Sequence, residues 1–204
     1  MVTSIFSFYP SQDKDPFFSR ISKILNLLLL WGNNVILIIA FGYQFARHEL
    51  PCPICLLQRV GIILISIGFF LNVRFGIRPS HYGVALVGCV ITILIAMRQV
   101  FLHITPGNLG YGSSIFGVHF YSLAVLSSLL TIITIAFLLL GQNWEESRKL
   151  MPLNLLTRWE KIAIIVFAVL IVGNFFSTVL ECELGKCVSD PIVYQLLNHH
   201  NFHP

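Results

Sequence analysis

Four consecutive residues, Cys52-Pro53-Ile54-Cys55, have the Cys-X-X-Cys spacing of a reactive dithiol. Pro51 precedes them, and Pro53 suits the first turn of a helix, where its missing N–H would have had no partner. Unpaired amide groups at a helix start favour a thiolate, which makes such pairs reactive at neutral pH. The sequence therefore predicts a redox-active dithiol at the beginning of a helix.

Arg59 shares a helix face with this dithiol, because positions 52, 55 and 59 are spaced by three and four residues. It lies roughly 6 Å deeper along the axis than Cys55, at ~1.5 Å per residue. A fixed cation beneath a dithiol suits an anionic or carbonyl-bearing electron acceptor dissolved in lipid, such as a quinone. The alternative is that Arg59 only extends to the membrane interface, as Arg near helix ends often does.

A second cysteine pair, Cys182 and Cys187, lies near the C-terminus. The intervening residues include Gly185 and permit a small turn closed by a disulfide. An exposed disulfide of this kind tends to exchange with thiols, although a static bridge fits the same spacing. A third possibility is that the two pairs together bind a structural zinc ion. The tail histidines, His199, His200 and His203, match no zinc spacing and are interpreted as a solvated terminus.

Composition assigns these motifs to a membrane protein. Of the 204 residues, 56% are hydrophobic and 11% are charged, and the mean hydropathy is +0.81. A hydrocarbon core of ~30 Å takes ~20 helical residues to cross, and the alternation of barrel strands is missing. Basic residues are too scattered for a nucleic-acid-binding face. The sequence predicts an all-α polytopic membrane helix bundle with five transmembrane helices, at residues 22–46, 54–73, 82–104, 116–140 and 161–180.

Five spans place the termini on opposite sides of the membrane, and the basic residues indicate which side is which. One side collects Lys14, Arg20, Lys23, Arg74, Arg78, Arg148, Lys149, Arg158 and Lys161. The other collects Arg47, Arg59, Arg98 and Lys186. The positive-inside rule then predicts a cytoplasmic N-terminus. Both cysteine pairs fall on the outer face, where disulfides persist, whereas Cys89 lies mid-span as an inert buried thiol.

The third predicted helix ends in Arg98-Gln99-Val100-Phe101-Leu102-His103. Gln99 and His103 share a helix face, whereas Arg98 points elsewhere. Polar residues within a span favour a functional role, with interhelical hydrogen bonding as the alternative.

At these residues the sequence resembles the DsbB family of disulfide-forming membrane proteins. The resemblance covers roughly residues 22–140, and its most specific motif is Leu50-Pro51-Cys52-Pro53-Ile54-Cys55-Leu56-Leu57-Gln58-Arg59. The segment 98–103 matches more loosely. Gly110-Tyr111-Gly112-Ser113 with Phe116-Gly117-Val118-His119-Phe120-Tyr121 is similar to the start of the family's fourth span.

The resemblance implies a thiol:quinone oxidoreductase of the bacterial inner membrane that reoxidises a DsbA-like periplasmic partner. Cys52 and Cys55 match the pair that passes electrons to ubiquinone or menaquinone, and Arg59 matches the arginine that contacts the quinone. Further quinone contacts are assigned to Gln58, Arg98, Gln99 and His103, and no metal is expected. Two rivals remain: electron flow in the opposite direction, as in relatives of vitamin K epoxide reductase, and a membrane scaffold whose four outer cysteines bind zinc.

The chain departs from the family pattern in its second cysteine pair. Well-known members have four spans and carry that pair in the loop between the third and fourth, but residues 105–114 contain no cysteine. Cys182 and Cys187, after an added fifth span, are therefore the candidates for the partner-facing catalytic pair. The expected organisation is a cytoplasmic N-terminal segment, a four-helix redox core, a cytoplasmic connection, a fifth span and a periplasmic tail, at residues 1–21, 22–140, 141–160, 161–180 and 181–204.

Overall fold

The computed structural model describes residues 16–47, 50–104, 114–115, 117–141, 156–182, 185, 187, 194 and 196. Five helices in this part of the chain are long and apolar enough to cross a membrane, which confirms the predicted all-α polytopic bundle. They are α1 (Pro16–Ala46), α2 (Pro53–Phe75), α3 (Pro79–Leu102), α4 (Phe120–Gly141) and α5 (Arg158–Cys182). Most of the predicted segments 1–21, 141–160 and 181–204 lies outside the described residues, as do Gly110–Ser113 and the tail histidines.

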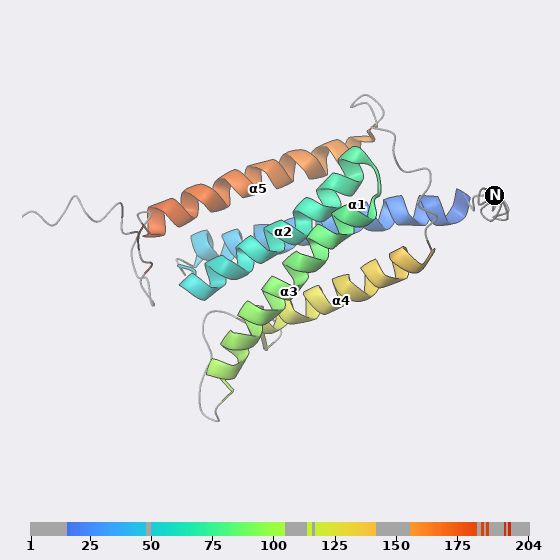
Figure 1. Cartoon of the computed structure of the whole chain (residues 1–204). Coiled ribbons are helices and arrows are strands. Elements are labelled where there is room, and N and C mark those ends of the chain that lie inside the picture. The colour runs from blue at the N-terminus through green and yellow to red at the C-terminus, as the bar shows by residue number, and fades with distance from the viewer. Residues whose placement is uncertain are drawn as a thin grey trace, which may run out of the picture.

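Helix α2 is the centre of the bundle (Figure 1). It contacts each of the other four helices, whereas α5 packs on α1 and α2, and α4 packs mainly on α3. The outer helices expose large apolar side chains such as Leu94, Ile133 and Leu140, as expected of a surface that faces lipid. The dithiol motif therefore begins the most enclosed helix of the molecule.

Glycines allow α2 and α3 to approach closely. A Cβ atom at Gly68 of α2 would lie 2.6 Å from the His81 carbonyl oxygen, and one at Gly88 of α3 would lie 2.6 Å from the Ile65 nitrogen. No side chain fits in either place, so the two backbones are in contact, as small residues permit in membrane helices. Cys89 is fully buried in the adjoining core, as predicted.

Amide side chains tie the helices together at the end of α2 that lies away from the dithiol. Asn72 Nδ2 donates to Asn26 Oδ1 at 2.8 Å, and Asn26 Nδ2 donates to the Tyr82 hydroxyl at 2.6 Å. These bonds join α1, α2 and α3. Asn34 Nδ2 donates to the Ala163 carbonyl oxygen at 3.0 Å and so joins α1 to α5. Interhelical hydrogen bonds of this kind stabilise helix pairs in lipid.

A short ribbon precedes α4. Strand β1 (Ser114–Ile115) pairs antiparallel with β2 (Val118–His119), and Gly117 turns between them with φ 80°. Residues 118 and 119 therefore pair as a strand, and the helix starts at Phe120 instead of the predicted residue 116. At the same end of the bundle, α5 continues to Cys182, past the predicted residue 180. These two extra residues place Glu181 and Cys182 inside the helix.

Candidate active site

The dithiol caps the N-terminus of α2. Cys52 is the N-cap residue, and its sulfur accepts the Cys55 backbone N–H at 3.2 Å, while Pro53 occupies the first turn. The two sulfur atoms are 2.6 Å apart, and both cysteines are free. Cys52 is 6% exposed, whereas Cys55 is partly exposed. The hydrogen bond with Cys55 and burial raise the pKa of Cys52, so this sulfur keeps its proton while the pair is reduced.

A glutamine pair faces the sulfur atoms from the α3 side. Gln99 Nε2 lies 3.8 Å from Cys52 Sγ and 3.7 Å from Cys55 Sγ. Gln58 Nε2 donates to Gln99 Oε1 at 2.7 Å, which leaves the Gln99 amide nitrogen turned toward the dithiol. Both glutamines are buried. Gln99 is thus placed to stabilise negative charge on either sulfur.

Gln99→Leu is expected to slow alkylation of the reduced dithiol about tenfold at neutral pH. A hydrogen bond to a charged group contributes ~1.5 kcal/mol, and its loss lowers the thiolate fraction. The measurement is the rate of iodoacetamide labelling followed by mass spectrometry. Phe101→Leu, an exposed change on the same helix, is the matched control and should label at the unaltered rate. Equal labelling rates in Gln99→Leu and the unmodified protein would contradict this role.

Arg59 is buried on the opposite, α1 side of the dithiol. Its Nη1 donates to Gln44 Oε1 at 2.8 Å, its Nη2 donates to the Ala40 carbonyl oxygen at 3.1 Å, and its guanidinium lies 5.1 Å from the centre of the Phe41 ring. Arg59 is 8% exposed, so it does not extend to an interface. The guanidinium is held as a fixed charge within electrostatic range of Cys55.

Helix α5 contributes to this arrangement by bonding Gln44 of α1, a residue that was not predicted from the sequence. Gln44 Nε2 donates to Ser177 Oγ at 2.8 Å and to the Tyr194 hydroxyl at 3.0 Å. The added fifth helix therefore helps to hold Arg59 in place. Gln44 is a polar residue inside an apolar span, which is the signal that could have identified it.

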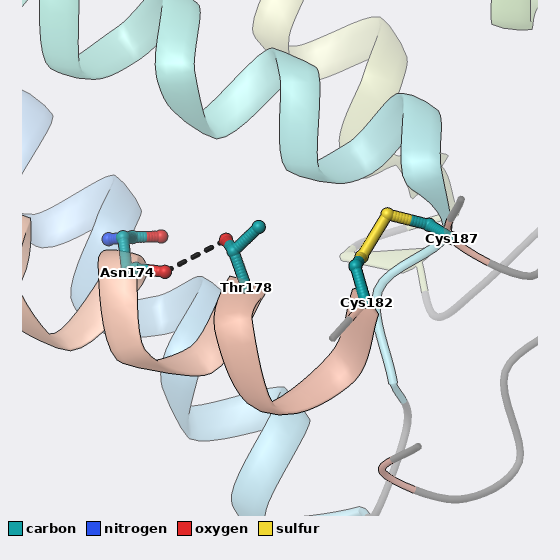
Figure 2. Close-up of a disulfide and its surroundings, with 4 residues drawn as sticks. All are labelled: Asn174, Thr178, Cys182 and Cys187. Atoms are coloured by element: carbon teal, nitrogen blue, oxygen red, sulfur yellow. Dashed lines mark hydrogen bonds between the residues drawn. A yellow bond between two sulfur atoms is a disulfide. The ribbon is translucent and has the colours of Figure 1, made fainter. Parts of the chain in front are cut away.

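The second cysteine pair forms a disulfide at the end of α5. Cys182 and Cys187 are bonded, with their Cα atoms 4.5 Å apart, and the Gly185 N–H donates to the Cys182 carbonyl oxygen at 2.7 Å, which closes the turn. Figure 2 shows the bridge beyond Asn174 and Thr178, at the end of α5 that lies beside the start of α2. Cys182 is 4% exposed and Cys187 is partly exposed. Both pairs thus share one end of the bundle, as the odd number of spans predicts.

Glu181, which the sequence analysis did not single out, is buried next to this bridge. It is 1% exposed, and neither carboxyl oxygen has a hydrogen-bond partner among the described residues. Arg59 and Cys52 lie within electrostatic range of it. Two turns of helix separate Glu181 from Asn174, and the intervening Ser177 lies on the same buried face.

The remaining predicted residues lie around this centre in different ways. Arg98 is exposed, so its neighbour Gln99 alone faces the dithiol. His103 is partly buried, with Nδ1 2.9 Å from the Gln99 carbonyl oxygen and its ring stacked 5.9 Å from that of Tyr121. The zinc alternative needs four thiolates, but the Cys182–Cys187 bond removes two of them. Among the described residues, no group of three or more His, Cys, Asp and Glu side chains is arranged to hold a metal ion.

Comparison with known proteins points to the same kind of protein as the geometry of the dithiol does. Disulfide bond formation protein B of Nitrosococcus oceani is 35% identical over 80 residues, which cover 36% of this chain and 46% of that relative. The match thus spans about half the length of the relative. No solved structure matches the chain. The model of the family "Disulfide bond formation protein DsbB" matches residues 22–172, which include α2, the dithiol, Arg59 and Gln99. A match over most of the chain, which includes this dithiol, shows that the chain belongs to the DsbB family.

Proposed function

We propose that the protein is a thiol:quinone oxidoreductase that reoxidises a DsbA-like, thioredoxin-fold partner and so supports disulfide bond formation. The observation that carries the proposal is the placement of two cysteine pairs at one end of the bundle, one free and one bonded, beside a buried arginine. By the distribution of basic residues, this end faces the periplasm and the N-terminus is cytoplasmic, in the bacterial inner membrane.

The two sulfurs of the Cys182–Cys187 disulfide, called the tail bridge below, differ in exposure, and this difference favours attack on Cys187. Cys182 is buried, so the partner's thiolate reaches the Cys187 sulfur, forms a mixed disulfide with it and releases Cys182 as a thiolate. Cys182 then attacks an oxidised Cys52–Cys55 bridge at the adjoining helix start. Resolution of the two mixed disulfides leaves the partner oxidised, the tail bridge restored and the Cys52–Cys55 pair reduced.

The α1 side of the dithiol fits a quinone ring. Phe41 and Phe45 stack with their ring centres 5.8 Å apart, Phe45 is exposed toward lipid, and the Arg59 guanidinium covers Phe41. Aromatic surface with a cation suits a planar ring that bears carbonyl oxygens. A bound quinone supplies a two-electron, two-proton acceptor. Arg59 stabilises negative charge beside Cys55, while Gln99 and Gln58 orient the sulfurs from the opposite side.

The test uses purified protein in quinone-containing vesicles with a reduced thioredoxin-fold protein as electron donor. We expect one quinol to form for each disulfide made in the donor, and no turnover without quinone. Oxidation of quinol by an oxidised donor would instead support the reverse direction of electron flow. Absence of thiol-dependent quinol formation, together with about one tightly bound zinc per chain, would favour the zinc scaffold.

A further inference from the structure

Glu181 is a carboxyl group buried within a membrane-spanning helix. Its side chain is 1% exposed, and its two oxygens lack hydrogen-bond partners in the described part of the chain. Burial of an unpaired carboxylate is costly, and ionisable residues inside spans are therefore usually functional. Glu181 directly precedes Cys182, at the end of the bundle that carries both cysteine pairs.

The groups that face Glu181 come from the two helices packed against α5 and from the tail. Helix α2 and its N-cap contribute Arg59 and Cys52, both within electrostatic range. Helix α1 contributes the neutral Gln44, which is bonded to Ser177 one helical turn before Glu181. From the tail, Tyr194 bonds Gln44 and lies in range of Arg59. Glu181 therefore lies within electrostatic range of both the dithiol and the arginine that we assign to the quinone.

Oxidation of the dithiol releases two protons, and the one on Cys52 is the harder to remove. The pKa of Cys52 is raised by its hydrogen bond with Cys55 and by burial. Its side chain is 6% exposed, so bulk water has little access to it. The described part of the chain has two carboxyl groups, and the other one, Glu160, is at the far end of α5. Glu181 is the one positioned to accept a proton here.

We propose that Glu181 accepts the proton of Cys52 when the dithiol is oxidised and passes it on toward the side of Arg59. The Cys52 S–H bond breaks, its proton moves to a carboxylate oxygen of Glu181, and the Cys52 sulfur bonds to Cys55. The electron pair leaves through Cys55 to the acceptor, a quinone in the proposed function. The proton of Cys55, which is partly exposed, passes to water when its thiolate forms, so that two protons and two electrons are released in all. The inference rests on the proposed function and adds a proton route to it.

The kinetic test compares Glu181→Gln with the unmodified protein across pH in the vesicle assay. At neutral pH we expect a loss of about 10²-fold, the low end for a general base. The unmodified protein should slow at acidic pH, because a protonated carboxyl accepts no proton. Glu181→Gln should lack this acidic limb and recover as pH rises, because hydroxide then removes the Cys52 proton. Glu181→Asp should keep the limb, and Glu160→Gln, the matched control, should behave as the unmodified protein does.

A second readout needs no quinone. Protein freed of quinone is oxidised with a small disulfide reagent whose thiolate products stay ionised at the working pH, and infrared difference spectra are recorded. We expect the carbonyl stretch of a protonated carboxyl group to appear on oxidation and to be missing in Glu181→Gln, whereas Glu160→Gln retains it.

Two results would overturn the inference while leaving the proposed function intact. One is an unchanged rate, pH profile and infrared band in Glu181→Gln. The other is an equal loss of rate at every pH, which indicates a positional role alone. If instead the unmodified protein reduces no quinone but shows the Glu181-dependent band, the proposed function fails and the proton route to Glu181 stands.

Discussion

Cys52→Ser and Cys55→Ser are each expected to lower thiol-dependent quinone reduction to the uncatalysed rate. A serine oxygen can neither form the disulfide nor pass on its electrons, and the two sulfurs 2.6 Å apart are the only free pair in the described part of the chain. The measurement is quinol formation by purified protein in vesicles with a reduced thioredoxin-fold donor. Cys55→Ser should also accumulate a Cys52–Cys182 disulfide, because Cys52 can attack the Cys182–Cys187 bridge and release the Cys187 thiol, but Cys55 is no longer there to take over Cys52.

Cys89→Ala is the control for this experiment. Cys89 is the third free cysteine, fully buried in the core between α2 and α3, and it lies away from the helix end that carries the dithiol. Its replacement removes a thiol without touching the site, so quinone reduction should persist. Activity of either serine variant at the level of Cys89→Ala would rule out the dithiol as the redox centre.

The second large effect concerns the tail bridge. In Cys182→Ser/Cys187→Ser, oxidation of the thioredoxin-fold donor is expected to fall to background, while a small dithiol reagent still reduces Cys52–Cys55 and drives quinol formation. The reason is that the proposed point of attack for a folded donor is the partly exposed Cys187, whereas a small reagent can also reach the Cys52–Cys55 pair directly. Donor oxidation and quinol formation are measured in parallel with both reductants.

The single variants separate an exchanging bridge from a static one. With a donor whose second cysteine is replaced by serine, attack on the intact Cys182–Cys187 bridge should leave a mixed disulfide between Cys187 and the donor, whereas Cys182→Ser and Cys187→Ser have no bridge to attack and should form none. Mixed disulfides are detected on non-reducing gels. A double-serine variant that oxidises the protein donor at the normal rate but unfolds more easily would identify the bridge as a structural one.

The helices and the position of the dithiol at a helix start could be predicted from the sequence, because both depend on local chemistry. Long apolar runs specify spans in any tertiary context, and Pro53 with Cys52 specifies a capped helix start. The predicted start of α4 was wrong because the pairing of Val118 with Ile115 depends on the turn at Gly117. The periodicity of apolar residues does not detect this turn.

The surroundings of the dithiol were predictable only in part. The i, i+4 pattern correctly separated Gln99, which faces the sulfurs, from the exposed Arg98. The depth of Arg59 followed from helix geometry, but its partners did not. Gln44 and Ser177 are 133 positions apart, and only the packing of α5 on α1 brings them together. Glu181 also depends on that packing, because the same residue on an unpacked helix end would be solvated.

The turn between Cys182 and Cys187 also limits the reach of the protein. Once the bridge opens, Cys187 remains tethered to the end of α5 by a chain whose ends are five positions apart. Even fully extended, such a tether spans at most about 18 Å. A thiol on so short a tether has an effective concentration in the millimolar range around its origin. A partner therefore has to bring its own sulfur to the end of the bundle. If Cys182 displaces the partner before the partner is oxidised, the Cys182–Cys187 bridge closes again.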